Sequence, residues 1–251
     1  MAEVQRQFED FHSEVKLDDE NAILREKRKI LIDNLRQRLK TMFEDREEDP
    51  PTFTHFNKGG YAMGLGVIPL DSDYDIDVGL EFDLCIDDFD DPVEVKQLVF
   101  DALEGHTDDV KIKQPCVTVQ YHLNDEPCYH IDFAVYAHES GDSDSIYLAM
   151  GKPHASEDRK YWMKDDPKGL IEAFRNRFDD KEEKAQFRRV IRYIKRWKDI
   201  KFSSDGHEAP IGIGIATAAY HWFTPVRILI DVFTNKYKSN DLQATRKLVG
   251  Q

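Results

Sequence analysis

The chain has 251 residues, of which 40% are hydrophobic and 33% are charged, a composition typical of a soluble globular protein with one large domain or two lobes. Its longest apolar run, 211–223, is too short to span a membrane, residues 1–16 are too polar for a signal peptide, and the three cysteines lack zinc-site spacing. We therefore expect a cytoplasmic protein with free thiols and no membrane partner.

The net charge of -14 is unevenly distributed along the chain. Residues 1–165 contain 38 Asp and Glu against 18 Lys and Arg, a net charge of -20, whereas residues 166–251 contain 11 against 17, a net charge of +6. A surface that binds the backbone of a long nucleic acid is built from Lys and Arg. The acidic first part therefore argues against an extended nucleic-acid interface, while the basic second part could face a nucleoside triphosphate.

The first part of the chain is predicted to alternate helices and strands. Leu24, Leu31, Leu35 and Leu39 recur at helical spacing, and the prolines that follow Asp49 end this long helix. The predicted elements are a helix at 18–45, a strand at 52–56, a connector at 63–70, a strand at 74–82, an acidic loop at 83–91 and a helix at 92–103.

The pattern changes at about residue 166. Before it, residues 110–122 alternate as one strand, with Pro115 at a bulge or edge position, and a turn at 124–127 leads into a strand at 129–136. After it the apolar spacing becomes helical. The predicted helices are 170–178, 182–198, 211–222, 226–236 and a short one from Asp241.

The most informative segment joins the glycine pair Gly59-Gly60 to the strand that carries Asp75 and Asp77. Alternate residues of a strand share a face, so both carboxylates project from one side while Ile76 is buried on the other. Adjacent carboxylates repel unless a cation neutralises them, and oxygen ligands suit Mg²⁺ or Mn²⁺. Glycines let backbone N–H groups approach an anion closely. The segment therefore predicts a site for a nucleotide and a divalent metal.

Two other interpretations of the acidic segment are weaker. A solvated acidic loop would not require the alternation of Ile76, Val78 and Leu80 with the acids. An EF-hand calcium loop requires Gly at its sixth position and Glu at its twelfth, which here are Ile76 and Phe82. We assign Asp73 to the loop before the strand.

A third acid, Asp132, lies among apolar residues of the strand at 129–136. One interpretation is a structural carboxylate near a strand end, satisfied by hydrogen bonds. If this strand lies beside the strand at 74–82, however, Asp132 completes a triad with Asp75 and Asp77. Two metal ions about 3.5–4 Å apart could then align an attacking hydroxyl with a triphosphate.

These motifs resemble the signature of polymerase-β-like nucleotidyltransferases, in which a Gly-Gly or Gly-Ser pair precedes an Asp-x-Asp strand and a third acid. The greater similarity is to the bacterial CD-NTases, DncV-like relatives of cyclic GMP-AMP synthase that make cyclic oligonucleotide signals in anti-phage defence (CBASS). The resemblance extends from about residue 24 to the end and is strongest between 57 and 170. The segments that carry it are 58–69, 73–78, 130–136 and 162–170.

The resemblance implies an α+β fold in two parts. Residues 1–165 would form a polymerase-β-like core, a mixed sheet with flanking helices and a long N-terminal helix, and residues 166–251 a helical lobe. Since relatives usually continue further, we expect the chain to be either a fragment or a form that lacks part of its helical lobe. The implied catalytic and metal-binding residues are Asp75, Asp77 and Asp132, with two Mg²⁺ or Mn²⁺ ions, and the implied nucleotide-binding residues are Lys58, Gly59, Gly60 and Lys195.

Two positions depart from the family pattern or leave alternatives open. Many CD-NTases have Ser where this chain has Gly60, so a hydroxyl contact to the triphosphate is missing, which either weakens donor binding or is offset by Lys58. The basic residues Arg188, Arg192, Lys195 and Arg196 recur at helical spacing. They form either a solvated basic face or a group from which Lys195 reaches the triphosphate.

The resemblance implies a monomeric enzyme that joins ribonucleoside triphosphates into a cyclic di- or oligonucleotide and releases pyrophosphate. A downstream effector would respond to the product. The alternatives are a nucleotidyltransferase that modifies an RNA end, an antibiotic or a protein hydroxyl, and an inactive nucleotide-binding scaffold. The acidic first part argues against the RNA end, and the presence of all three acids argues against the inactive scaffold.

Overall fold

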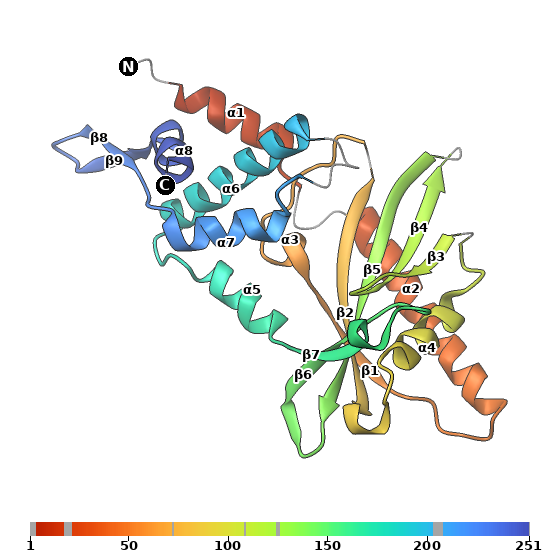
Figure 1. Cartoon of the computed structure of the whole chain (residues 1–251). Helices are drawn as coiled ribbons and strands as arrows, with labels where there is room; N and C mark the ends of the chain where they lie inside the picture. Colours follow the sequence, from red (N-terminus) through yellow and green to blue (C-terminus); the bar gives the residue numbers. More distant parts are fainter. Residues whose placement is uncertain are drawn as a thin grey trace. The chain divides into compact units, whose positions relative to one another are not determined.

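The computed structural model describes residues 4–17, 22–71, 73–107, 109–123, 126–202 and 208–250. The chain divides into two compact units (Figure 1). Unit 1 comprises Met1–Asp19, Gly60–Leu70 and Gly169–Gln251, and unit 2 comprises Glu20–Gly59 and Asp71–Lys168. This division differs from the predicted one at 165/166, because the first residues and the segment after the glycine pair cluster with the C-terminal helices.

Unit 2 is built on a mixed sheet, as the family resemblance implied. Among the described residues its central path runs in the order β1-β2-β5-β4-β3, with β6 pairing β5 and β7 pairing β6. Strands β2 and β5 are parallel, and the other pairs are antiparallel. The strands are β1 (Phe53–Asn57), β2 (Tyr74–Cys85), β3 (Asp109–Ile112), β4 (Val117–Leu123), β5 (Glu126–Glu139), β6 (Asp142–Met150) and β7 (Tyr161–Asp165).

Two helices, α2 (Ala22–Glu44) and α4 (Val93–Leu103), supply the apolar face that covers this sheet (Figure 1). Leu31, Leu35 and Leu39 of α2 are buried in the same cluster as Val95 and Val99 of α4, since residues three and four apart share a helix face. The predicted long helix and the helix after Pro92 are confirmed, although residues 18–21 lie outside the described part of the chain.

Strand β2 shows why the acids face away from this core. Ile76, Val78, Leu80 and Phe82 are buried in the cluster beneath the helices. Because side chains alternate along a strand, the residues between them, including Asp75 and Asp77, project from the opposite face. The burial of the apolar residues of β2 therefore determines which face of the sheet carries the acids.

The prediction of one strand at 110–122 was wrong. The segment forms the antiparallel hairpin β3–β4, in which Ile112 pairs with Val117 and the N–H of Lys113 donates to the carbonyl of Cys116 at 2.9 Å. Pro115 lies in the turn, where its missing N–H costs no ladder hydrogen bond. The predicted acidic loop at 83–91 also begins later, because β2 continues to Cys85 and a 3-10 turn, η1 (Ile86–Asp88), follows.

Unit 1 is mainly helical, around a core that contains Phe174, Phe187, Val190, Ile191 and Phe223. Buried Asp241 accepts hydrogen bonds from Arg189, Gln186 and Tyr193, and its own N–H donates to Gln5 at 2.8 Å. The helices are α1 (Gln5–Val15), α5 (Pro167–Arg175), α6 (Lys181–Lys201), α7 (Gly212–Trp222) and α8 (Asp241–Val249); α3 (Gly59–Ala62) begins at the last residue of unit 2.

The predicted helix at 226–236 was wrong, because these residues enter the hairpin of β8 (Arg227–Asp231) and β9 (Lys236–Ser239). The β-branched residues Ile228 and Ile230 favour a strand over a helix. The carboxylate of Asp231 then accepts hydrogen bonds from the N–H groups of Phe233 at 2.9 Å and Thr234 at 3.3 Å, which stabilises the turn.

The structure also bears on the expectations about thiols and membranes. The three cysteines are all free. Across the described ranges, no helix is both long enough and apolar enough to cross a membrane.

Candidate active site

The parallel pairing of β2 with β5 brings the three predicted acids together. In this register Asp75 lies opposite His130, and Asp77 lies opposite Asp132. The condition on which the triad depended, that the strand of Asp132 lies beside the strand of Asp75 and Asp77, is therefore met. Asp132 is no isolated structural carboxylate, since two further acids lie on the neighbouring strand.

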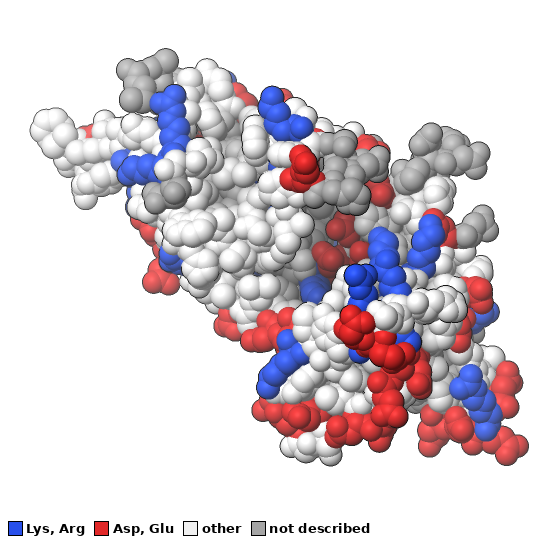
Figure 2. Space-filling view, viewed as in Figure 1, with Lys and Arg blue, Asp and Glu red and all other residues white. Residues whose placement is uncertain are grey.

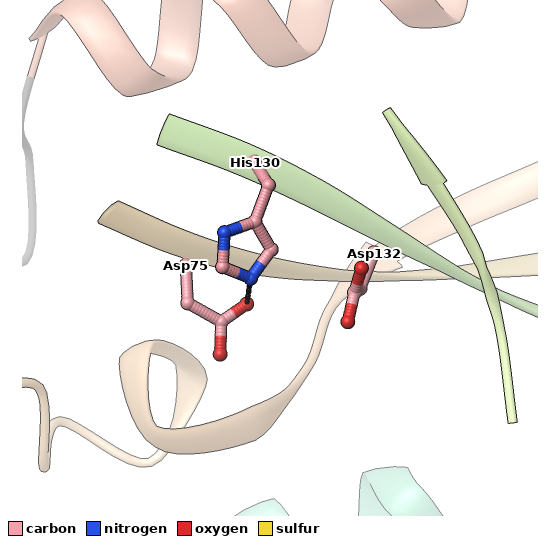
Figure 3. A group of neighbouring side chains, drawn as sticks. All are labelled: Asp75, His130 and Asp132. Atoms are coloured by element: carbon pink, nitrogen blue, oxygen red, sulfur yellow. Dashed lines mark ion pairs between the residues drawn. The ribbon is translucent and has the colours of Figure 1, made fainter. Parts of the chain in front are cut away.

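Three side chains at this place could hold a metal ion: Asp75, His130 and Asp132 each offer one ligand atom, and these atoms lie within 4.8 Å of one another. Figure 3 shows one ring nitrogen of His130 directed at the carboxylate of Asp75, with Asp132 farther along the strand that carries His130. Carboxylate oxygens are ligands that Mg²⁺ and Mn²⁺ accept, and imidazole suits Mn²⁺ better than Mg²⁺. The donor set fits a divalent cation.

Asp77 differs from Asp75 in exposure, because Asp77 is half-buried, like Asp132, whereas Asp75 is exposed. Burial, together with the nearby charges of Asp75 and Asp132, raises the pKa of Asp77 to about 7. A Cβ atom built on Gly59 would lie 1.7 Å from Oδ2 of Asp77, and Gly59 has a φ of +65°, so only glycine fits there. The glycine thus lets this carboxylate lie against the backbone, and a bound cation would relieve its repulsion from its neighbours.

His130 was missed by the sequence analysis, and so was the contact that Asp73 makes. Nδ1 of His130 lies 3.1 Å from both carboxylate oxygens of Asp73, and Nε2 lies 3.4 Å from Oδ1 of Asp75. Burial lowers the pKa of His130, but its hydrogen bonds to Asp75 and Asp73 outweigh this and raise the pKa to about 9. The signal was present in the sequence, since His130 is two residues before Asp132 and so shares its strand face.

Lys58 also lies in unit 2, where its groups already have partners. Its backbone N–H donates to the carbonyl of Asp77 at 2.9 Å, and its ammonium donates to the hydroxyl of Tyr136. That hydroxyl donates to Asp165 at 2.8 Å, and the ammonium lies 3.7 Å from the same carboxylate. Its positive charge opposes the rise in the pKa of Asp77. Lys58 therefore links the end of β1 to β5 and β7.

The remaining predicted phosphate-binding residues, Gly60 and Lys195, belong to unit 1. The ammonium of Lys195 donates to the carbonyl of Leu65 at 3.1 Å and lies 3.0 Å from the position that a Cβ atom of Gly60 would take. The lysine nitrogen thus lies beside the space where a serine side chain would begin. A serine at position 60 would require this ammonium to move.

Two of the four basic residues predicted at helical spacing in α6 do not lie on a solvated face. Arg192 and Arg196 are buried, with 3% and 6% of their surface exposed. Arg192 donates to the carbonyls of Gly64 and Gly66, and Arg196 donates to that of Ile68. These side chains therefore hold the segment that follows the glycine pair, a contact that helical spacing alone does not reveal.

The acidic surface of unit 2 agrees with the excess of Asp and Glu counted in residues 1–165. Figure 2 shows Asp and Glu side chains spread over much of the face of unit 2 that is turned to the viewer, interrupted by a group of Lys and Arg side chains. This distribution favours a compact site over a continuous basic track for a long nucleic acid.

The part of the chain that carries the three acids is similar to known proteins. Residues 53–136 match the family model described as "Cyclic GMP-AMP synthase DncV-like, nucleotidyltransferase domain". The chain is 27% identical over 187 residues to a cyclic GMP-AMP synthase of Escherichia albertii, which covers 72% of this chain and 38% of that protein. The chain thus spans little more than a third of the length of this curated relative.

Solved structures show the same fold. The Vibrio cholerae DncV cyclic AMP-GMP synthase in complex with the linear intermediate 5′ pppA(3′,5′)pG matches with a TM-score of 0.67 at 18% identity, over 95% of this chain and 74% of that chain. The Bradyrhizobium diazoefficiens CD-NTase CdnG in complex with GTP matches with a TM-score of 0.59 at 13% identity, over 85% and 69%. The expected α+β fold with a mixed sheet and flanking helices is therefore confirmed. With its Asp-x-Asp strand paired to the strand of a third acid, the segment 53–136 is similar to the DncV-like nucleotidyltransferase domain, and the chain is similar in sequence to a bacterial cyclic GMP-AMP synthase.

Proposed function

We propose that this protein is a metal-dependent nucleotidyltransferase that joins ribonucleoside triphosphates into a cyclic di- or oligonucleotide and releases pyrophosphate. The observation that carries the proposal is the parallel β2–β5 register, which gathers Asp75, Asp77 and Asp132 on one face of the sheet. These three residues would hold divalent ions. When bound, the ions would neutralise phosphate charge and activate a ribose hydroxyl.

The chemistry requires one bond to form and one to break. The hydroxyl oxygen of one nucleotide attacks the α-phosphorus of another, the bond from that phosphorus to the β-phosphate oxygen breaks, and pyrophosphate leaves with the electron pair. A second transfer within the linear product closes the ring. The carboxylates contribute by orienting the reacting groups and by balancing charge as it develops.

The triphosphate is assigned to the glycine pair and to Lys195. Gly59 and Gly60 offer backbone N–H groups without side chains that would obstruct an anion. The ammonium of Lys195 lies beside Gly60 within unit 1 and supplies a positive charge. Lys58 is assigned a supporting role, because its ammonium is engaged by Tyr136 and Asp165.

The relatives support the substrate class and the reaction type. One solved DncV is a cyclic AMP-GMP synthase with a linear dinucleotide triphosphate bound, and CdnG has GTP bound. The similarity to the CD-NTases supports a role in anti-phage signalling through a cyclic-nucleotide-responsive effector. We propose both for this chain on that basis.

The test is incubation of the purified protein with all four ribonucleoside triphosphates and Mg²⁺ or Mn²⁺, followed by mass spectrometry of phosphatase-resistant products. We expect a cyclic product from the wild type and none from the Asp75→Asn/Asp77→Asn variant. Equal signals from the two proteins would end the proposal. Pyrophosphate release without a resistant product would instead favour transfer to another acceptor.

A further inference from the structure

Strand β4 lies against β5 on the side away from β2 and faces the acids with polar side chains. The antiparallel register places Thr118 opposite Asp132 and Gln120 opposite His130. Because residues two apart share a strand face, Thr118 and Gln120 lie on the same face as the groups they pair with. Neither residue belongs to the predicted site, and both form hydrogen bonds that lead to it.

The first contact is direct. Thr118 is buried, with 4% of its surface exposed, and its hydroxyl donates to Oδ1 of Asp132. The ammonium of Lys113, in the β3–β4 turn, lies 3.8 Å from the same oxygen. A buried hydroxyl with a fixed strand position restricts rotation of the carboxylate that it holds.

The second contact passes through three side chains. Nε2 of Gln120 donates to Oδ1 of Asp73 at 3.1 Å and to the carbonyl of Tyr129 at 3.1 Å, which fixes the amide. The carboxylate of Asp73 lies 3.1 Å from Nδ1 of His130. The partner of one ring nitrogen sets the direction of the other. Here it directs Nε2 of His130 to Oδ1 of Asp75, 3.4 Å away.

We propose that β4 is the positioning strand of the metal site: Thr118 orients Asp132 directly, and Gln120 orients Asp75 through Asp73 and His130. The proposal rests on the proposed function in treating Asp75 and Asp132 as cation ligands. His130 is a positioning residue in this scheme, because its Nε2 atom is directed at a carboxylate oxygen of Asp75 and Mg²⁺ prefers oxygen ligands.

Asp75 needs such positioning contacts more than Asp132 does, because its side chain is more exposed. The side chain of Asp75 is 56% exposed, so neighbouring atoms restrict its rotation little, whereas that of Asp132 is 20% exposed. Ligands must be held within about 0.5 Å of the productive geometry, and loss of an outer hydrogen-bond partner lowers metal affinity about 10- to 100-fold. Asp75, the more exposed ligand, is held through Gln120, Asp73 and His130, whereas Asp132 is held by Thr118 directly.

Binding of Mn²⁺ to the nucleotide-free protein, followed by electron paramagnetic resonance, tests the proposal without any turnover. We expect Thr118→Val to weaken Mn²⁺ binding about 10-fold and Thr118→Ser, which keeps the hydroxyl, to restore it to within about 2-fold. The matched control is Thr41→Val, since the Thr41 hydroxyl donates within α2, to the carbonyl of Gln37. Circular dichroism and thermal melting establish that each variant is folded.

The route from Gln120 to Asp75 and the route from Thr118 to Asp132 predict different effects on Mn²⁺ affinity when two substitutions are combined. Gln120→Leu and His130→Leu act along one route, so the double variant should bind Mn²⁺ no more weakly than His130→Leu alone. Thr118→Val acts on the other ligand, so its effect should multiply with that of His130→Leu, to about 100-fold in total. Unchanged affinity in Thr118→Val and Gln120→Leu would overturn the proposal.

A direct measurement separates positioning from ligation. Electron spin echo envelope modulation detects nitrogen bound to Mn²⁺, and we expect no directly bound nitrogen in the wild type. A strong nitrogen coupling that disappears in His130→Leu would make His130 a ligand and contradict its positioning role. If these binding results hold but no nucleotide product forms, the proposed function fails while the positioning strand stands.

Discussion

The two units differ in how far their clustered carboxylates are satisfied by neighbouring residues. In unit 1, Asp241 is fully buried, and its carboxylate is satisfied by Arg189, Gln186 and Tyr193. In unit 2, Asp75, Asp77 and Asp132 gather on one face, and partial burial, together with the charges of Asp75 and Asp132, raises the pKa of Asp77 to about 7. A charge cluster that the fold satisfies contributes to stability, whereas one left partly unsatisfied is available to a ligand.

The largest expected effect comes from removing the unsatisfied charges. Asp75→Asn/Asp77→Asn should reduce cyclic product at least about 10³-fold, because the ligands that hold the ions are lost. The same variant should melt at the same temperature or a few degrees higher, since the repulsion between neighbouring carboxylates is relieved. Product analysis and thermal melting of the same samples check both parts. A large fall in melting temperature would contradict the contrast between the units.

Removing the satisfied charge should have the reverse effect on stability. Asp241→Ala removes the buried carboxylate that pairs with Arg189 and Gln186, leaving Arg189 only the more exposed Glu182 as an ion-pair partner, and should lower the free energy of unfolding by about 3–5 kcal/mol. Urea denaturation measures this loss. Asp33→Asn is the control, because the ion pair of Asp33 with Lys29 is exposed and contributes little.

Gly59→Ala should produce an intermediate effect, since it disturbs the place where Asp77 lies against the backbone. The added Cβ would meet the carboxylate of Asp77 at 1.7 Å, and the backbone would hold alanine at a φ of +65°. We expect a loss of about 1–3 kcal/mol and a reduced affinity for Mn²⁺. Gly105→Ala is the matched control, because its φ is +77° but a Cβ there meets nothing within 4 Å. Equal losses in the two variants would show that backbone strain alone matters.

The smallest expected effect is a pH dependence in unit 1. Burial, together with the positive charge of Arg192, lowers the pKa of His12 to about 4, and Nε2 of His12 accepts a hydrogen bond from Arg192 at 3.0 Å. Between pH 6.5 and 4 the unfolded chain therefore binds the proton that the folded chain rejects, so stability falls as pH falls through this window. His12→Gln should show a shallower decline in urea denaturation at several pH values. Parallel curves would mean that His12 has no such role.

The predictions from sequence were most accurate where the apolar pattern matches the alternation of side chains along a strand. The alternation in β2 correctly assigned Ile76 and Val78 to the core and the acids to the other face, because side-chain direction in a strand is a local property. The split of 110–122 at Pro115 was missed because alternation alone does not mark where one strand ends and the next begins. The hairpin at 227–239 was missed because the strand and helix preferences of short apolar runs overlap.

Contacts between distant segments were beyond that reasoning. The register that pairs Thr118 with Asp132, and the contact of Asp73 with His130, depend on which strands are neighbours. The carbonyls that receive Arg192 and Arg196 come from residues more than 100 positions earlier in the chain. Such pairings follow from tertiary structure, which no single-segment pattern encodes.

The link between Asp241 and the first helix has a consequence for how the protein folds as it is synthesised. The N–H of Asp241 donates to Gln5, and the hydroxyl of Tyr193 donates to the carbonyl of Phe8. Unit 1 therefore joins residues of α1 to residues that are made 185 and 236 positions later, whereas every segment of unit 2 has been made by Lys168. We expect the sheet with its acids to fold first, while the N-terminal helix waits for its partners.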